Sequence, residues 1–413
     1  MNNAHKFECE ATVTFLGFGA VQLGKKGNGY KNMIDTILSE ETRIFRDMVR
    51  KFAQKEIAPH VKEWEKDGKY PPQYYEKLSE MGFMGLLVPE TYGGTGGNII
   101  HLVILCEELG RVGVSFPMTH VSACCRAIVN QGTEDQKRKY LPDLASGKKI
   151  AAYCQTEPEA GSDSGNMSSF ADKRDGYYLL NGRKVFISNG KIASVYIVLA
   201  KTEKNLEKPS RGIAMFIVDR DIPGVAVGKT EELMGRHCSS LDEVIFDNVK
   251  VPSENLLVPA GGRGFKEIMA EFNGERCGNA AFCVGFAQGA YERALQYCKE
   301  RVQFGRPIAE LQGIRWTLAE MATQIQAARL LIYDAATKME TKKQSVAKEA
   351  AMAKRFANEM SIWVCDKAIQ LLGAYGYTTD YEVERYYRDV RGWSMGGGTT
   401  QVCLNRIARE ILA

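Results

Sequence analysis

The chain has 413 residues, of which 45% are hydrophobic and 25% are charged, as in an ordinary globular protein. This length exceeds one core and indicates two or three domains. The net charge of +4 is too small to indicate nucleic acid or a membrane surface as a partner. No apolar run approaches the roughly 20 residues that span a bilayer, so no membrane insertion is expected.

Eleven cysteines and five histidines lack the regular spacings of metal ligands, so we predict no metal site. The irregular cysteine spacing also argues against a disulfide scaffold and favours a reducing, cytoplasmic location.

Residues 1–35 are expected to form an N-terminal extension, and a disordered tail is one interpretation of it. Residues 1–32 are glycine-rich and carry no arginine, unlike a transit peptide, and they lack the ordered regions of a secretory signal. The run Gly17-x-Gly19 resembles the start of a dinucleotide fingerprint. However, Gln22 stands where the third glycine belongs and no βαβ unit follows, so the motif predicts no nucleotide site.

Residues 36–150 are predicted to form a helical domain, because apolar residues recur at three- and four-residue spacing from Ile44 to Phe52. The same period returns over residues 263–413 and is clearest from Leu311 to Leu331. Long helices with few interruptions pack most readily as a bundle.

Residues 151–262 show a period of two, which is typical of strands. Asn181-Gly182 lies between the alternating runs Tyr177–Leu180 and Lys184–Ser188, which predicts a β-hairpin. Many short strands in succession suggest a small antiparallel barrel or sandwich. The further strands are expected at Ser194–Lys201, Gly212–Asp219, Val225–Lys229 and Asp242–Val251.

Four motifs stand out at Tyr153–Asp163, Asn181–Gly190, Arg301–Pro307 and Gln370–Tyr377. Composition alone allows the first to be a capped turn. Together, in this order, they resemble the acyl-CoA dehydrogenase family over the chain from about Leu38 to the C-terminus. The resemblance implies an α+β multidomain fold, with an N-terminal helical domain, a middle antiparallel β-barrel and a C-terminal four-helix bundle, usually assembled as a homotetramer.

The resemblance also implies FAD as the cofactor and an acyl-CoA thioester as the substrate. The matched residues fall into three groups. Contacts with the flavin ring are expected from Tyr153, Gln155, Thr156, Phe186 and Ser188. The pyrophosphate and adenosine of a neighbouring subunit's FAD are expected to meet Arg301, Gln303 and Phe304, with Gln370, Gly373, Thr399 and Gln401 completing that pocket. Substrate contacts are expected from Ser162, Asn273 and Arg276.

The family pattern breaks near the C-terminus. Many members carry a catalytic glutamate in a Tyr-Glu-Gly-Thr loop, where this chain has Gly397, and glycine cannot accept a proton. Members resembling isovaleryl-CoA and long-chain acyl-CoA dehydrogenases instead place the base before an arginine on the first bundle helix. Here that residue is Glu275, which we expect to be the base, with a pKa raised by desolvation. Its alternative role is an exposed helix residue paired with a lysine.

The implied reaction is α,β-dehydrogenation of an acyl-CoA, with the backbone N–H of Gly397 polarising the thioester and an electron-transferring flavoprotein taking the electrons. An enoyl-CoA reductase, an oxidase or a desulfinase on the same scaffold remains an alternative, as does a non-catalytic subunit that binds FAD or CoA. The position of the base favours a branched or substituted acyl group, and aromatic or dicarboxylic groups stay open. Glu157 is interpreted as structural, and Glu159 has no assigned role.

Overall fold

The structure, a computed structural model, describes residues 38–203, 206–261, 264–341 and 346–412. The expected N-terminal extension and its Gly17-x-Gly19 motif lie outside these residues. Within the described part, no helix combines the length and apolar character needed to cross a membrane.

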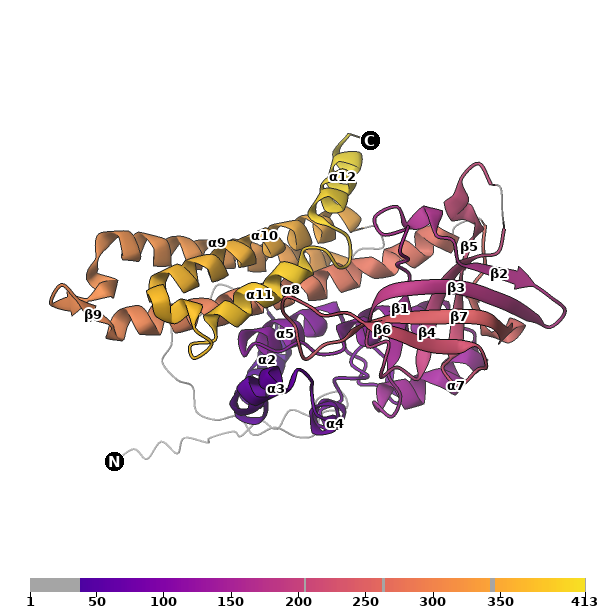
Figure 1. Cartoon of the computed structure of the whole chain (residues 1–413), viewed down its shortest axis with the longest axis horizontal. Helices are drawn as coiled ribbons and strands as arrows, with labels where there is room; N and C mark the ends of the chain where they lie inside the picture. Colours follow the sequence, from indigo (N-terminus) through magenta and orange to yellow (C-terminus); the bar gives the residue numbers. More distant parts are fainter. Residues whose placement is uncertain (1–37, 204–205, 262–263, 342–345, 413) are drawn as a thin grey trace, which may run out of the picture.

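The N-terminal part is helical, as predicted (Figure 1). Helix α2 (Glu40–Phe52) begins after Ser39, whose hydroxyl accepts the N–H of Thr42 at 3.2 Å and so caps the helix. The helix over Ile99–Arg111 is buried along most of its length. The α-helices among the described residues of this part are α2 (Glu40–Phe52), α3 (Val61–Asp67), α4 (Pro72–Glu80), α5 (Ile99–Arg111), α6 (Arg126–Gln131) and α7 (Glu134–Ala145).

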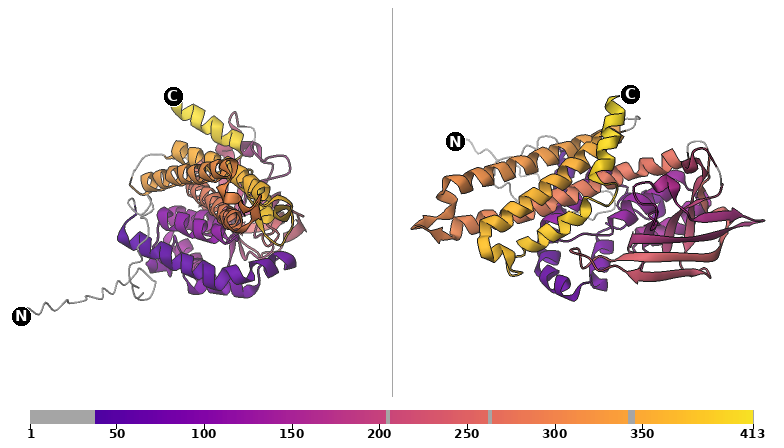
Figure 2. Two further views of the ribbon diagram at one scale, coloured as in Figure 1. Left: turned by 90° about the vertical axis from the view of Figure 1, so that its left-hand side faces the viewer. Right: turned by 45° about the horizontal axis from the view of Figure 1, so that its top comes forward.

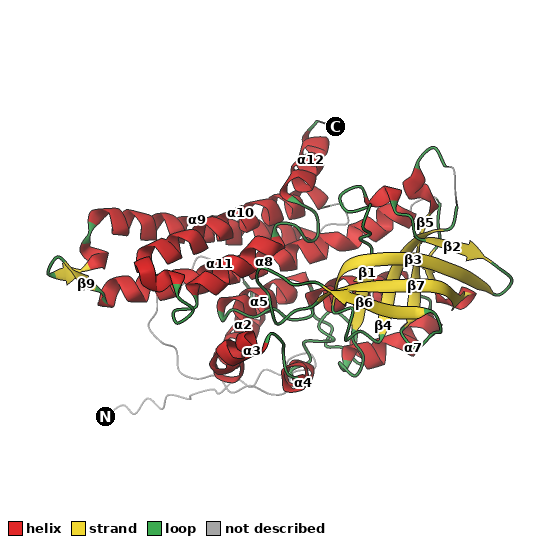
Figure 3. Cartoon of the chain, viewed as in Figure 1, coloured by secondary structure: helices red, strands yellow, loops and turns green. Residues whose placement is uncertain are grey.

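The middle part is a curved eight-stranded sheet with the order β6-β7-β3-β2-β4-β5-β8, with β1 paired to β4 (Figure 3). Most neighbours are antiparallel, as expected, but β4 pairs in parallel with β1 and, at one position, with β2. The strands are β1 (Ala151–Cys154), β2 (Phe170–Lys173), β3 (Tyr177–Ser188), β4 (Val195–Lys201), β5 (Ile213–Asp219), β6 (Val225–Thr230), β7 (Leu241–Pro252) and β8 (Leu256–Val258).

The predicted hairpin at Asn181-Gly182 is wrong, because β3 runs through both residues as one strand. Its pairing with β7 shifts register at this point, which marks a bulge. A Cβ on Gly182 would overlap the Ser169 hydroxyl, so glycine is needed here for close approach and not for a turn. The real hairpin joins β2 to β3, where the N–H of Arg174 bonds the carbonyl of Tyr177 at 2.8 Å.

The C-terminal part is a bundle of long helices, and a small hairpin lies at the end farthest from the sheet (Figures 1 and 2). The last helix projects from the bundle. The helices are α8 (Gly264–Glu300), α9 (Gln312–Thr341), α10 (Ala347–Leu372), α11 (Val383–Trp393) and α12 (Thr400–Ile411), and the hairpin strands are β9 (Val302–Gln303) and β10 (Arg306–Pro307).

Helix α8 connects the parts of the molecule because it packs on α5 as well as on α9, α10 and α11. The contact with α5 is close: a Cβ on Gly110 would lie 2.8 Å from the carbonyl oxygen of Phe282, and one on Gly285 would overlap that of Glu107. Glycine at these positions lets the two backbones approach. The N-terminal half of α8 is therefore held between the N-terminal helices and the loop that precedes α12.

Candidate functional site

Glu275 on α8 lies directly against Gly397 in the loop between α11 and α12. The glutamate is only 6% exposed. A Cβ built on Gly397 would overlap its Oε2 and lie 2.8 Å from its Cδ. The carboxylate thus occupies the space in which a side chain at position 397 would begin, and the two alternative base positions converge on one place.

The Glu275 carboxylate is buried without being neutralised by a direct partner. Its Oε2 has no hydrogen-bond partner among the described residues, and none of the ion pairs found there includes it. Burial raises the pKa of Glu275, while Lys354, Arg276 and the Asn279 amide act in the opposite direction. A buried carboxylate with a raised pKa and an open acceptor oxygen suits a general base.

A buried polar network holds the loop around Gly397. Arg276 donates to the Gly397 carbonyl at 3.3 Å and to Asn273 Oδ1 at 3.0 Å. Lys354 on α10 donates to the carbonyls of Gly398 at 2.8 Å and Trp393 at 3.3 Å. The loop backbone is therefore fixed from two helices, and the contacts seen for Asn273 and Arg276 are with each other and with this loop.

Lys354 was missed in the sequence, although a signal was present. It lies with Asn358 and Ser361 at i, i+4 and i+7 on an otherwise alanine-rich helix face, and all three are buried. Burial lowers the pKa of Lys354, and the nearby Glu275 opposes this shift. Polar residues that recur on the buried face of a helix indicate a satisfied internal network.

Gly397→Ala should displace the Glu275 carboxylate. Gly397 has φ +69°, which alanine adopts only with strain, and the new methyl group would occupy the volume of Oε2. We expect the variant to remain folded and to carry out the dehydrogenation that the sequence resemblance implies about tenfold to 10²-fold more slowly, measured as the rate at which acyl-CoA bleaches the flavin. Gly396→Ala is the matched control, because a Cβ there meets no atom within 4 Å. Equal slowing of both variants would contradict the steric argument.

The residues matched to the flavin ring come together where β1 and β3 meet. The N–H of Val185 bonds the carbonyl of Thr156 at 2.9 Å, which ties the loop after β1 to β3. Phe186, at φ +58°, is 56% exposed, and Gln155 Oε1 is buried without a partner among the described residues. An open aromatic face beside an unsatisfied amide suits a flat heteroaromatic ring with polar edges.

A buried ion pair fixes this loop. Lys184 Nζ lies 2.7 Å from Glu157 Oε1, and both side chains are almost fully buried. The lysine also donates to the Gln155 carbonyl at 3.2 Å, and Glu157 accepts the N–H of Ser169 at 3.0 Å. These contacts agree with a structural part for Glu157, whereas Glu159 and Ser162 are exposed.

The residues predicted to bind the pyrophosphate and adenosine lie mainly at the C-terminal end of α8, away from Glu275 in its N-terminal half (Figure 1). Arg301, Gln303 and Phe304 belong to the exposed β9–β10 hairpin, and Phe304 is 91% exposed. The Tyr297 ring, one turn before Arg301, lies 6.4 Å from that of Tyr375. This contact brings the last turn of α10, which carries Gln370, and the segment after it, which carries Gly373, to the same end.

Within one chain, this second group is therefore far from the flavin-ring group. Thr399 and Gln401 lie at the start of α12, directly after the Gly397 loop. The Thr399 hydroxyl caps that helix by accepting the N–H of Val402 at 3.2 Å. The structure therefore brings together the flavin-ring residues, and the hairpin residues with Gln370 and Gly373, but it does not bring Thr399 and Gln401 to the hairpin.

Comparison with known proteins gives matches along nearly the whole described chain. The models of the acyl-CoA dehydrogenase N-terminal, middle and C-terminal domains match residues 39–148, 152–249 and 262–412. An acyl-CoA dehydrogenase of Bacillus subtilis (strain 168) is 42% identical over 378 residues, which cover 91% of this chain and 99% of that protein.

Two further relatives differ in their named activities. The caffeyl-CoA reductase-Etf complex subunit CarC of Acetobacterium woodii is 42% identical over 368 residues, covering 88% of this chain and 96% of the relative. The solved structure of butyryl-CoA dehydrogenase from Megasphaera elsdenii superposes with a TM-score of 0.87 at 38% identity, covering 91% and 99% of the two chains.

Proposed function

Because the chain belongs to the acyl-CoA dehydrogenase family, whose members are flavin-dependent oxidoreductases, we propose that it uses FAD to oxidise an acyl-CoA thioester to its 2-enoyl-CoA. The observation that carries this proposal is the buried Glu275 carboxylate, whose unpartnered Oε2 lies against Gly397. Glu275 removes the proton from the carbon next to the thioester. When bound, FAD supplies the acceptor for the hydride that leaves the adjacent carbon.

The loop before α12 supplies the second part of the chemistry. The N–H of Gly397 makes no hydrogen bond within the described chain and is the donor that we assign to the thioester carbonyl. A fixed donor at the oxygen where enolate charge develops is typically worth about 3 to 4 kcal/mol. Arg276 and Lys354 act as positioning residues, because they hold the loop carbonyls and not the substrate.

The cofactor residues fit FAD only if two chains contribute. The β1 and β3 residues would contact the flavin ring, and the Arg301 hairpin of a second copy would contact the phosphates, which suit a guanidinium fork. The exposed aromatic residues at that end of the bundle, which include Phe304, Trp316 and Tyr377, support an interface there. We infer a homo-oligomer, with a tetramer as the expected form.

The proposed base gives a prediction for pH dependence. Burial raises the pKa of Glu275 above its ordinary value near 4.5, and only the ionised form accepts the α-proton. We therefore expect kcat/KM to rise with pH through that raised pKa and then to level off. Assays with ferricenium as the electron acceptor, repeated across the pH range, measure this rise in kcat/KM. A profile that is already flat from pH 4.5 upward would contradict the assignment.

Reduction of an enoyl-CoA is the second candidate, because the relative from Acetobacterium woodii is named as a caffeyl-CoA reductase subunit. That name also supports an electron-transferring flavoprotein as the redox partner. Anaerobic titration of the yellow protein with an acyl-CoA panel tests the dehydrogenase. Bleaching of the flavin by acyl-CoA supports oxidation. If acyl-CoA does not bleach the flavin but enoyl-CoA reoxidises the reduced flavin, the result supports the reductase. Rapid oxygen consumption would indicate an oxidase.

A further inference from the structure

A small cavity of about 30 Å³ lies between the end of β3, the segment before η4 (His120–Cys125) and the last turn of α11. Its wall includes Ser188 from the predicted flavin-ring group and Trp393, whose carbonyl lies 3.4 Å from Asn279 of the Glu275 site. Met118, also in the wall, packs against α8 at Gly278, three residues after Glu275. The cavity is thus adjacent to the proposed base and to the flavin side.

The lining combines an apolar stretch with a polar end. Phe116, Pro117 and Met118 supply apolar surface. The hydroxyls of Ser115 and Ser239 lie 3.1 Å apart, and the Tyr70 hydroxyl, which meets the N–H of Ser115 at 3.0 Å, lies beside them. A pocket for a plain hydrocarbon chain needs no such group of polar atoms.

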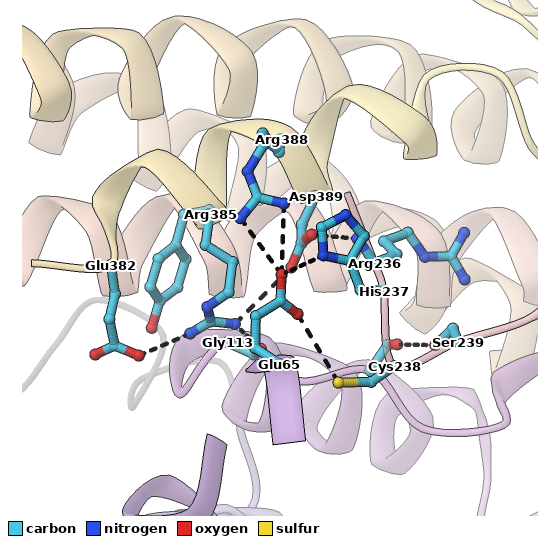
Figure 4. Close-up of polar contacts among 12 residues, drawn as sticks. Glu65, Gly113, Arg236, His237, Cys238, Ser239, Glu382, Arg385, Arg388 and Asp389 are labelled. Atoms are coloured by element: carbon cyan, nitrogen blue, oxygen red, sulfur yellow. Dashed lines mark hydrogen bonds and ion pairs between the residues drawn. The ribbon is translucent and has the colours of Figure 1, made fainter. Parts of the chain in front are cut away.

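Arg236 places a cation in this wall (Figure 4). It lies in the loop between β6 and β7, at φ +58°, a conformation that costs energy in a non-glycine residue and persists only where the surroundings impose it. The backbone N–H of Arg236 donates to the carboxylate of Asp389 on α11. The guanidinium of Arg236 stacks over Trp393, with Cζ 4.1 Å from the ring centre. The backbone is therefore anchored while the side chain turns toward the cavity.

The charged end of this side chain lacks a hydrogen-bond partner. Nε is buried without one, and Figure 4 shows no contact from the guanidinium to the other residues drawn. Neighbouring charges are paired: His237 with Glu65 at 3.0 Å, and Arg385 with Glu382 at 3.1 Å. Burial lowers the pKa of Arg236, with Asp389, Tyr70, Cys283 and Glu275 opposing the shift. A partly buried guanidinium whose Nε lies buried without a hydrogen-bond partner suits an anion.

We propose that Arg236 binds a carboxylate at the far end of the acyl group, so that the substrate is a dicarboxylic acyl-CoA. This inference rests on the proposed dehydrogenase and names its substrate class. The hydroxyls of Ser115, Ser239 and Tyr70 complete the carboxylate site. The thioester end lies at Glu275 and Gly397. The cavity has room for the terminal carboxylate, and the methylene groups between the two ends lie along Phe116, Pro117 and Met118.

The test compares thioesters that differ only in the terminal carboxylate: glutaryl-, adipyl- and pimelyl-CoA against pentanoyl-, hexanoyl- and heptanoyl-CoA. In the holoenzyme, we expect kcat/KM for the best dicarboxylic substrate to exceed that of its neutral counterpart by about 30-fold or more. Arg236→Met should remove this preference and leave the neutral substrates unchanged or improved, and Arg236→Lys should retain part of it. Arg174→Met, on the exposed β2–β3 turn, is the control.

A second measurement does not depend on turnover. Calorimetric titration of the oxidised holoenzyme with the corresponding 2-enoyl-CoA thioesters should show the same preference and the same loss in Arg236→Met. If acyl-CoA bleaches the flavin but Arg236→Met slows both substrate classes equally, or if the wild type prefers neutral chains, the carboxylate site is overturned and the dehydrogenase stands. If no acyl-CoA bleaches the flavin, the proposed function fails, and calorimetry alone then decides whether Arg236 recognises the carboxylate.

Discussion

We expect Glu275→Gln to retain the bound flavin and its yellow colour but to reduce it with acyl-CoA about 10²- to 10⁴-fold more slowly, the range typical of the loss of a positioned general base. Glutamine has nearly the same shape as glutamate, so the space beside Gly397 stays filled. The amide cannot accept the α-proton. Stopped-flow measurement of flavin bleaching with a saturating substrate gives the rate directly.

The matched control is Glu320→Gln on α9, an exposed glutamate whose Oε1 accepts a hydrogen bond from the Gln324 amide at 2.7 Å. It should bleach at the wild-type rate. Bleaching of the Glu275→Gln protein at that same rate would remove the proposed base. Binding of acyl-CoA, followed by perturbation of the flavin spectrum, should survive in both variants, which separates loss of chemistry from loss of the substrate site.

Lys184→Met should destabilise the protein by about 3 to 5 kcal/mol, because it leaves the carboxylate of Glu157 buried without its cation. The pair is 2.7 Å long, and the lysine side chain is fully buried. Urea unfolding of the holoenzyme measures the change. The exposed pair between Arg174 and Asp172 is the comparison, since Arg174→Met should cost less than about 1 kcal/mol. Equal costs for the two would contradict the argument.

The double variant Lys184→Met/Glu157→Leu distinguishes an unpaired charge from lost packing, because removing both charges should restore much of the stability. Acid adds a further test. Burial acts to raise the pKa of Glu157, but Lys184 and the serine hydrogen bonds outweigh it and lower the pKa to about 2. Since this is below the ordinary value, the stabilisation is present above pH 4.5 and is lost as pH falls toward 2.

The periodic parts of the fold were predictable from the sequence. The strands at Val195–Lys201 and Ile213–Asp219 and the long helix at Gln312–Thr341 agree with the expected segments within a residue or two at their starts, because burial on a sheet or in a bundle imposes those periods directly. Asn181-Gly182 failed because the local turn preference was overridden by the close approach of Ser169. No local pattern contains that contact.

The candidate site was likewise predictable from the sequence only in part. Glu275 was assigned through a family resemblance, but its position against Gly397 depends on how α8 packs on the loop before α12, 122 positions along the chain from the base. Arg236 escaped notice because Gly235-Arg236-His237 resembles an ordinary polar turn. Only the docking of that turn on α11 reveals the cation without a partner.

The separation of the two cofactor groups along α8 has a consequence for how the enzyme is loaded. If each FAD bridges two copies of the chain, its affinity includes the free energy of association between them. Dilution should then release flavin and subunits together, and added FAD should drive reassembly. The apoprotein would be expected to sediment as smaller particles than the yellow form.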